Sequence, residues 1–262
     1  VLYFHNDPLS MNGSKSNNER LLLINLCSKI IFNSEWSKKR FLTNLSEIYK
    51  KSEKLFVVQQ STQKQKINLK NKKKIITFVG KLNKAKGYDV FGSAILDILN
   101  KYKNWSAIVI GDEEREKHYF KHKNLNVLGF QNHSNVLKIF KKSSISVVCS
   151  RWEEPFGRTS LESSSCGCAV IITNRGGLPE TITNGIIVEK LNKKNIFEAI
   201  EQLIINKKTR INLQKLSLKN FSLTNKNASR LIDDYRNQLL EKDKKNHRKR
   251  LKILHVTNFN ER

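Results

Sequence analysis

Residues 75–205 alternate regularly between short apolar runs and longer amphipathic segments, and this alternation limits the possible folds more than any other feature of the chain. The apolar runs are nearly continuous, as in strands that are buried on both faces. We expect strands over 75–79, 106–110, 125–128, 145–149, 169–173 and 186–188. The segments between them predict helices over 88–103, 113–122, 134–142, 157–166 and 193–205. Strands that alternate with helices predict an α/β domain, in which a parallel sheet has helices on both faces.

The first part of the chain shows the same alternation on a smaller scale. Its apolar runs are again separated by segments with helical spacing, and Ser34 can cap one of these helices. We expect strands over 1–4, 29–32 and 55–58 and helices over 19–27 and 35–45. The block is therefore a second, smaller α/β unit.

The domain boundaries follow from changes in composition. Residues 59–73 are polar and rich in lysine without periodicity, which is typical of a linker. We expect a partial first domain with its linker over 1–70 and a second domain over 71–241. Residues 242–262 would form a basic linker and the start of a further strand. A less favoured arrangement adds 251–258 to the sheet of the first block.

The net charge of +26 suits contact with nucleic acid, anionic lipid or phosphorylated substrates. The lysines are spread along the whole chain, and the densest basic run, Lys242–Arg250, is typical of a solvated linker. No aromatic residues are interleaved with the basic ones as in RNA-binding modules, so we expect no nucleic-acid partner. Peripheral contact with an anionic membrane stays open.

The cysteines and histidines give no sign of a metal site. The cysteines are scattered among apolar residues, as reduced core cysteines of a cytoplasmic protein are. They are Cys27, Cys149, Cys166 and Cys168. His118 and His122 have ligand spacing for a helix, but no third ligand is evident. No apolar run approaches the roughly 20 residues that cross a bilayer. We expect a cytoplasmic protein without a metal.

The loops after the strands are the place to look for chemistry, because ligands of open parallel sheets bind beyond the carboxyl ends of the strands. Gly80-Lys81 follows the first strand of the second domain, and Lys86-Gly87 precedes its helix. Glycine lets a phosphate approach the backbone, and a helix N-terminus offers unpaired N–H groups. Two lysines there suit a diphosphate, although an ordinary basic loop would look the same.

Two further loops follow later strands. Glu154 lies in a loop that opens a helix, and Glu162 lies within that helix beside Leu161 and small residues. A carboxylate in such a crowded place can accept two hydrogen bonds from a ribose diol, although an exposed helical glutamate is the alternative. The next loop, Asn174–Glu180, contains paired glycines and a proline that predict a tight turn at the same sheet edge.

The three loops together resemble those of the GT-B glycosyltransferases of family 4. The resemblance rests on Gly80-Lys81 with Lys86-Gly87, on Glu154 and Glu162 around Phe156-Gly157, and on the Gly-Gly-Leu-Pro-Glu turn at 176–180. It covers roughly residues 1–240. Lys81 stands where the family usually has arginine, so it would hold a phosphate as a point charge rather than as a fork.

The resemblance implies roles for these residues. Lys81 and Lys86 would hold the donor diphosphate, and Glu162 would bind the nucleotide ribose. Glu154 would lie beside the donor sugar. The donor-binding set is Gly80, Lys81, Lys86, Phe156, Gly157, Arg158, Thr159 and Glu162. His5 resembles a family histidine that contacts the donor sugar from the other domain, so the implied catalytic residues are Glu154, Lys86 and His5.

The implied protein is a retaining, metal-independent glycosyltransferase of the hexosyltransferase type. It would take a nucleoside-diphosphate sugar as donor, need no cofactor, and act on a glycan or lipid-linked acceptor in cell-envelope polysaccharide biosynthesis. A GT-B enzyme has two Rossmann-like domains, and the first one here lacks its early strands. We therefore expect a segment of a longer polypeptide with tandem transferase units. The alternative is a non-catalytic nucleotide-sugar-binding module.

Overall fold

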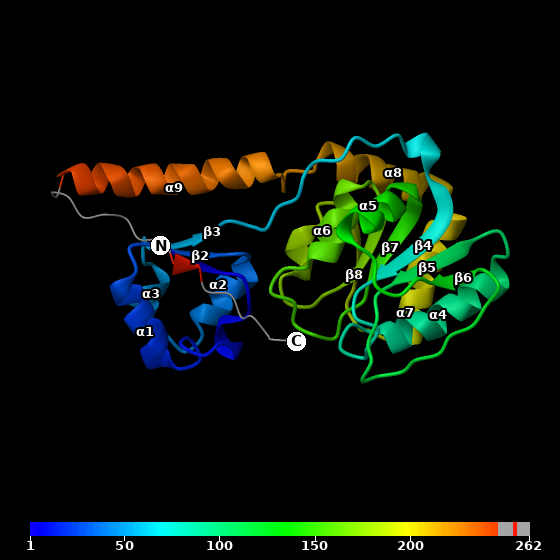
Figure 1. Cartoon of the computed structure of the whole chain (residues 1–262), viewed down its shortest axis with the longest axis horizontal. Helices are drawn as coiled ribbons and strands as arrows, with labels where there is room; N and C mark the ends of the chain where they lie inside the picture. The colour runs from blue at the N-terminus through cyan, green and yellow to red at the C-terminus, as the bar shows by residue number, and fades with distance from the viewer. Residues whose placement is uncertain (246–253, 256–262) are drawn as a thin grey trace. The chain divides into compact units, whose positions relative to one another are not determined.

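The computed structural model describes residues 1–245 and 254–255, which belong to two compact units. One unit comprises Val1–Ser61 with the chain from Leu223 onward, and the other comprises Thr62–Ser222 (Figure 1). Each unit has its own parallel sheet. The predicted α/β fold with parallel sheets is therefore confirmed.

The second unit is built on a six-stranded parallel sheet in the order β6-β5-β4-β7-β8-β9. Its strands are β4 (Lys73–Val79), β5 (Ser106–Ile110), β6 (Leu125–Val127), β7 (Ser143–Val148), β8 (Ala169–Thr173) and β9 (Gly185–Val188). Its α-helices are α4 (Tyr88–Lys101), α5 (His133–Lys142), α6 (Arg158–Ser165), α7 (Lys193–Ile205) and α8 (Lys207–Lys219). Two 3-10 turns, η2 (Leu69–Asn71) and η3 (Leu178–Thr181), complete it. The order reverses at β4, because β5 lies on one side of it and β7 on the other.

The sheet of the second unit is buried on both faces, as its apolar strands predict. Alternate side chains point to opposite faces, and the two faces belong to separate hydrophobic clusters. Ile171 packs with residues of α4 and α7, whereas Val170 and Ile172 pack with residues of α5. The helices therefore form layers on the two sides of the sheet (Figure 1).

One predicted helix is absent, because the chain has no helix between Ile110 and Leu125. Local and long-range contacts hold this segment as a loop. The Glu113 carboxylate accepts hydrogen bonds from Arg115 and from Asn83, which lies in another loop. The Phe120 ring packs edge-on to Tyr88, with 5.5 Å between centroids. The helical prediction over 113–122 was wrong. His118 and His122 therefore do not have the spacing of metal ligands on one face of a helix.

The first unit has a parallel sheet in the order β10-β1-β2-β3. Its strands are β1 (Leu2–Phe4), β2 (Ile30–Phe32), β3 (Leu55–Val57) and β10 (Leu254–His255). Its helices are η1 (Pro8–Ser10), α1 (Asn17–Leu26), α2 (Glu35–Phe41), α3 (Glu47–Lys50) and α9 (Asn225–Lys245). A capping box between Ser16 and Glu19 starts α1. The rings of Phe4, Phe32 and Phe41 pack together in the core.

The C-terminal part of the chain departs from the expected arrangement in two places. Helix α9 packs with the first unit rather than extending the second, because the Tyr235 ring lies on Phe56 and Gln238 accepts a hydrogen bond from buried Lys29. Strand β10 pairs with β1, Leu254 opposite Leu2, which is the less favoured of the two arrangements considered for this segment. The linker expected from 242 is wrong at its start, because α9 continues to Lys245, and residues 246–253 and 256–262 of the expected segment lie outside the described residues.

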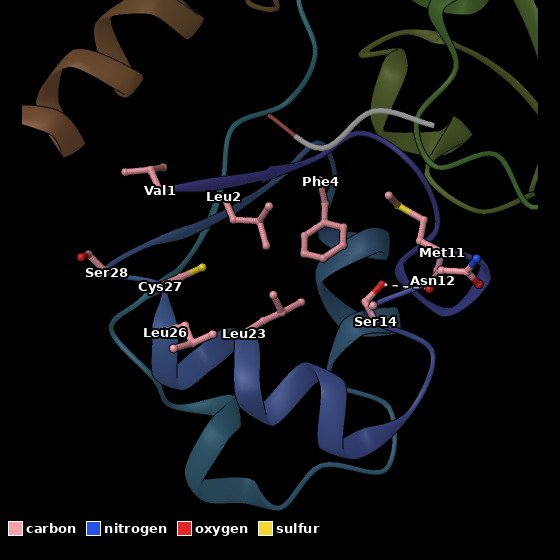
Figure 2. Close-up of a pocket in the computed structure, with 11 residues that line it drawn as sticks. Val1, Leu2, Phe4, Met11, Asn12, Ser14, Leu23, Leu26, Cys27 and Ser28 are labelled. Carbon is pink, nitrogen blue, oxygen red and sulfur yellow. Dashed lines mark hydrogen bonds between the residues drawn. The ribbon is translucent and has the colours of Figure 1, made fainter. Parts of the chain in front are cut away.

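The first unit also contains an apolar pocket of about 340 Å³. Figure 2 shows Leu2 and Phe4 of β1 on one side of it, Leu23 and Leu26 of α1 on another, and Met11 and Ser14 in the loop between them. Among the residues that the structure describes, no lysine, arginine or carboxylate lines this pocket, so these residues offer no chemistry for a diphosphate.

The cysteines differ sharply in burial, and we expect their reactivity to differ accordingly. Burial raises the pKa of Cys149 and of Cys166 to about 12 and also raises the pKa of Cys168. Few thiolates then exist near pH 8, and the thiolate is the reactive form. Cys27 is only partly buried. Iodoacetamide labelling followed by mass spectrometry should therefore find Cys27 modified first. Equal rates for Cys149 in native and denatured protein would contradict the fold.

Candidate functional site

The loops that the sequence singled out meet at the carboxyl edge of the six-stranded sheet. They follow β4, β7 and β8, and the loop after β5 lies beside the first of them. The ends of β4 and β5 lie close together, because the N–H of Gly80 donates to Ile110 O at 3.0 Å. A Cβ on Gly111 would lie 1.9 Å from the Gly80 carbonyl oxygen. The backbones of Gly80 and Gly111 therefore approach so closely that a larger residue at 111 would clash. No side chain of these two residues would keep a phosphate away from the backbone.

Two helices begin at this edge without a side-chain cap. Gly87 starts α4 in the left-handed region at φ 73°, and Gly157 starts α6. Glycine has no side chain to cap either helix, although the Asp89 carboxylate accepts backbone hydrogen bonds in the first turn of α4. The first turn of α6 has no acidic residue, so its N–H groups and the positive end of its dipole can bind an anion.

Lys86 and Glu154 come together across this edge. The Lys86 ammonium pairs with Glu154 Oε1, and the Ser150 hydroxyl donates to the same oxygen at 2.9 Å. The Glu154 side chain is 13% exposed and that of Lys86 is 34% exposed. The Gly177 N–H donates to the Glu154 carbonyl at 2.6 Å, so the glycine turn fixes the backbone of this residue.

A network behind Lys86 holds its loop in place. Asn83 accepts a hydrogen bond from the Lys86 backbone N–H at 3.0 Å and donates to Glu113 at 3.0 Å. Hydrogen bonds from Arg115 and then from Asn83 lower the pKa of Glu113 to about 2. Glu113 is therefore ionised at neutral pH. Sequence reasoning missed Asn83 and Glu113. They belong to no motif, and they position the Lys86 loop rather than face the candidate site themselves.

Glu162 lies in α6 with its side chain only 8% exposed. Its Oε1 is 3.0 Å from Arg158 Nη2 and 3.2 Å from His133 Nε2. The side chains of Arg158 and His133 are both more than half exposed, so a ligand can reach the group. His133 at the start of α5 was not among the predicted residues. Only the packing of α5 beside α6 brings it to Glu162.

The other predicted residues lie in different surroundings. Lys81 is exposed in the loop after β4. Phe156 is 1% exposed, so its ring is part of the core and only its backbone can meet a ligand. Arg158 and Thr159 form the first turn of α6. The described residues contain no group of three or more His, Cys, Asp or Glu that could hold a metal ion.

His5 belongs to the first unit, whereas the remaining predicted site residues belong to the second. Its ring packs on Tyr3 at 4.3 Å between centroids, and its carbonyl accepts a hydrogen bond from Asn33 at 2.7 Å. These contacts account for its place at the end of β1. Its contact with the donor sugar stays a prediction.

Comparisons with known proteins match the sequence of the second unit and the fold. The family model described as Glycosyl transferases group 1 matches residues 59–219. The chain is 31% identical over 164 residues to spore coat protein SA of Bacillus subtilis, a match that covers 55% of this chain and 43% of that protein. It is 32% identical over 139 residues to the capsular polysaccharide biosynthesis glycosyltransferase CapM of Staphylococcus aureus, covering 50% and 36%. The chain thus spans less than half the length of these relatives.

The fold resembles solved structures over nearly the whole chain. The crystal structure of HepE from Anabaena in complex with UDP superposes with a TM-score of 0.77. The superposition covers 90% of this chain and 72% of that one, at 17% identity. None of the helices in the described part of this chain is both long and apolar enough to span a membrane.

Proposed function

The chain belongs to the glycosyl transferases group 1 family, and we propose from this premise that it transfers a sugar from a nucleoside-diphosphate sugar to an acceptor with retention of configuration. The observation that supports this best is the pairing of Lys86 with Glu154 at the carboxyl edge of the sheet. A cation and a carboxylate lie together there beside two uncapped helix N-termini. That set can hold a diphosphate and a sugar hydroxyl at once.

The proposed chemistry is electrostatic stabilisation of the leaving group. When the bond between the anomeric carbon and the diphosphate breaks, negative charge grows on the diphosphate. Lys86, Lys81 and the first turns of α4 and α6 would meet this charge. Because two ammonium groups and two helix dipoles would supply the positive charge, we propose a reaction that needs no metal ion. Glu154 would then exchange its contact with Lys86 for a hydroxyl of the donor sugar.

The remaining roles place the rest of the donor. Glu162 would accept hydrogen bonds from the ribose hydroxyls, and the backbone at Phe156 and Gly157 would bind the sugar. His5 would contact the sugar from the first unit. A uridine nucleotide is the first donor to test, because the HepE structure holds UDP. The names of the relatives suggest a cell-envelope glycan or its lipid-linked precursor as acceptor, handled in the cytoplasm or at an anionic membrane surface.

The experiment that tests this function is calorimetry with UDP, GDP and ADP, each with and without EDTA, followed by turnover of the sugar nucleotide that binds. We expect nucleotide binding that EDTA leaves unchanged, and NMR should find the anomeric configuration of the donor in the product. Binding without any transfer or hydrolysis would favour the non-catalytic module. Binding that requires a divalent ion, or an inverted product, would contradict the mechanism.

Glu162→Ala should weaken nucleotide binding by about 10- to 150-fold, which corresponds to roughly 1.5–3 kcal/mol for hydrogen bonds to a charged group. Binding of a sugar 1-phosphate, which has no ribose, should not change. The matched control is Glu198→Ala, which removes an exposed carboxylate of α7. Equal losses for both ligands would show that Glu162 does not hold the ribose.

A further inference from the structure

A groove of about 640 Å³ lies at the opposite edge of the second unit from the candidate site. It is formed where the chain enters β4 and where α5 ends just before β7. The candidate site lies beyond the carboxyl ends of the same strands. Since β4 has seven residues, the two edges are about 20 Å apart at roughly 3.3 Å per residue. We call this feature the basic groove; its lysines are Lys66, Lys70, Lys72, Lys73, Lys138, Lys141 and Lys142.

The basic groove contains no compensating acid. Its other lining residues are one isoleucine and two asparagines. The sequence has no Asp or Glu over 54–88 or over 117–152, the two stretches that form its walls. Two lysines elsewhere in this unit have acidic partners, Lys101 with Glu201 and Lys193 with Asp97. Seven of the ten described lining residues are lysines, so positive charge is concentrated in the groove.

Some of these lysines have roles in the fold. The Lys72 ammonium donates to Phe140 O at 2.8 Å and to Cys166 O at 2.7 Å, so it satisfies carbonyls at the ends of α5 and α6. Lys141 and Lys142 lie in the last turn of α5, where a cation interacts favourably with the helix dipole. These contacts explain three of the seven lysines.

The other four lysines have no such role. The side chains of Lys66, Lys70, Lys73 and Lys138 are exposed and form no hydrogen bond or ion pair with any other residue that the structure describes. Like charges that line one groove repel one another, and the fold gains nothing visible from keeping them together. An anion in the groove would remove this repulsion.

We propose that the basic groove binds a soluble ligand that carries several closely spaced phosphate groups. Lysine binds phosphate as a point charge, so seven lysines and two asparagines suit a ligand with many oxygens better than a single planar carboxylate. The groove is concave, and its one apolar residue, Ile67, is partly buried against the core. It therefore offers no side chain to insert into a bilayer. No aromatic residue lines it for stacking on bases.

The test is calorimetry with tripolyphosphate on the whole chain and on two variants that each lose four positive charges. The groove variant carries Lys66→Gln, Lys70→Gln, Lys138→Gln and Lys142→Gln. The control variant carries the same change at four exposed positions of α8, namely Lys207, Lys208, Lys215 and Lys219. We expect the groove variant to bind at least about tenfold more weakly and the control to stay within about twofold, since scattered exposed charges contribute little.

Further arms separate the alternatives. Lys81→Gln with Lys86→Gln removes charge at the other edge. If the proposed function holds, this variant should lose one of two binding events for tripolyphosphate, and the remaining event should keep the affinity of the groove. Circular dichroism should find both four-site variants folded, and Lys66→Gln with Lys70→Gln alone should already weaken binding. Equal losses in groove and control variants would overturn the proposal. So would saturable binding to phosphatidylglycerol vesicles without binding of tripolyphosphate, because that result would identify a lipid surface.

Discussion

We expect Lys86→Ala to lower the proposed rate of sugar transfer by about 10²–10³-fold, the range seen when one donor to a developing negative charge is removed from a preorganised site. The reason is the position of the Lys86 ammonium group. It lies at the carboxyl edge of the sheet, one residue before the helix that begins at Gly87, and it is held against Glu154. In the transition state it would meet the charge on the departing diphosphate, so its loss should affect turnover more than donor affinity.

The variant should remain folded. Its loop is held by backbone contacts that alanine keeps, such as the hydrogen bond from the backbone N–H of residue 86 to Asn83. Glu154 loses a cation but still accepts a hydrogen bond from Ser150. The matched control is Lys84→Ala, which removes an exposed lysine from the same loop. Steady-state kinetics should show a large fall in kcat for the first variant and little change for the second. Equal effects of the two would refute a specific role for Lys86.

The sheet of the second unit could be predicted from the sequence because its strands are buried on both faces. Residues 169–173 are apolar up to Thr173, and all five are buried in the structure. Strand β8 and helix α7 therefore begin and end at the predicted residues. Glycine turns at the strand ends predicted the edge where the loops meet, because parallel strands end together. In these elements the apolar pattern of the sequence and the packing in the structure give the same bounds.

The errors lie where distant contacts decide the structure. The segment 113–122 has many residues that form helices well, yet Asn83 and Tyr88 hold it as a loop. Helix α9 shows its amphipathic pattern in the sequence, but not that Phe56 is the surface its Tyr235 covers. The pairing of His133 with Glu162 likewise depends on two helices that lie on the same face of the sheet. No motif spacing records such contacts.

Gly87→Ala should lower the free energy of unfolding by about 3–5 kcal/mol, in the range of severe steric substitutions. The residue adopts φ 73°, and a Cβ there would lie 1.9 Å from the Cys149 carbonyl oxygen. That oxygen belongs to backbone, so α4 would have to move away from the loop after β7. The same movement would separate Lys86 from Glu154, and nucleotide binding should be lost together with stability.

Gly129→Ala separates the two causes, because Gly129 has a similar φ of 64° but no atom within 4 Å of its added Cβ. The left-handed conformation alone costs an alanine roughly 1–2 kcal/mol. Urea denaturation followed by circular dichroism should therefore find Gly129→Ala mildly destabilised and able to bind nucleotide. The difference between the two variants measures the clash with Cys149. Similar stabilities for both variants would mean that α4 does not pack against the Cys149 backbone as closely as the structure has it. The geometry proposed for the diphosphate site would then be wrong as well.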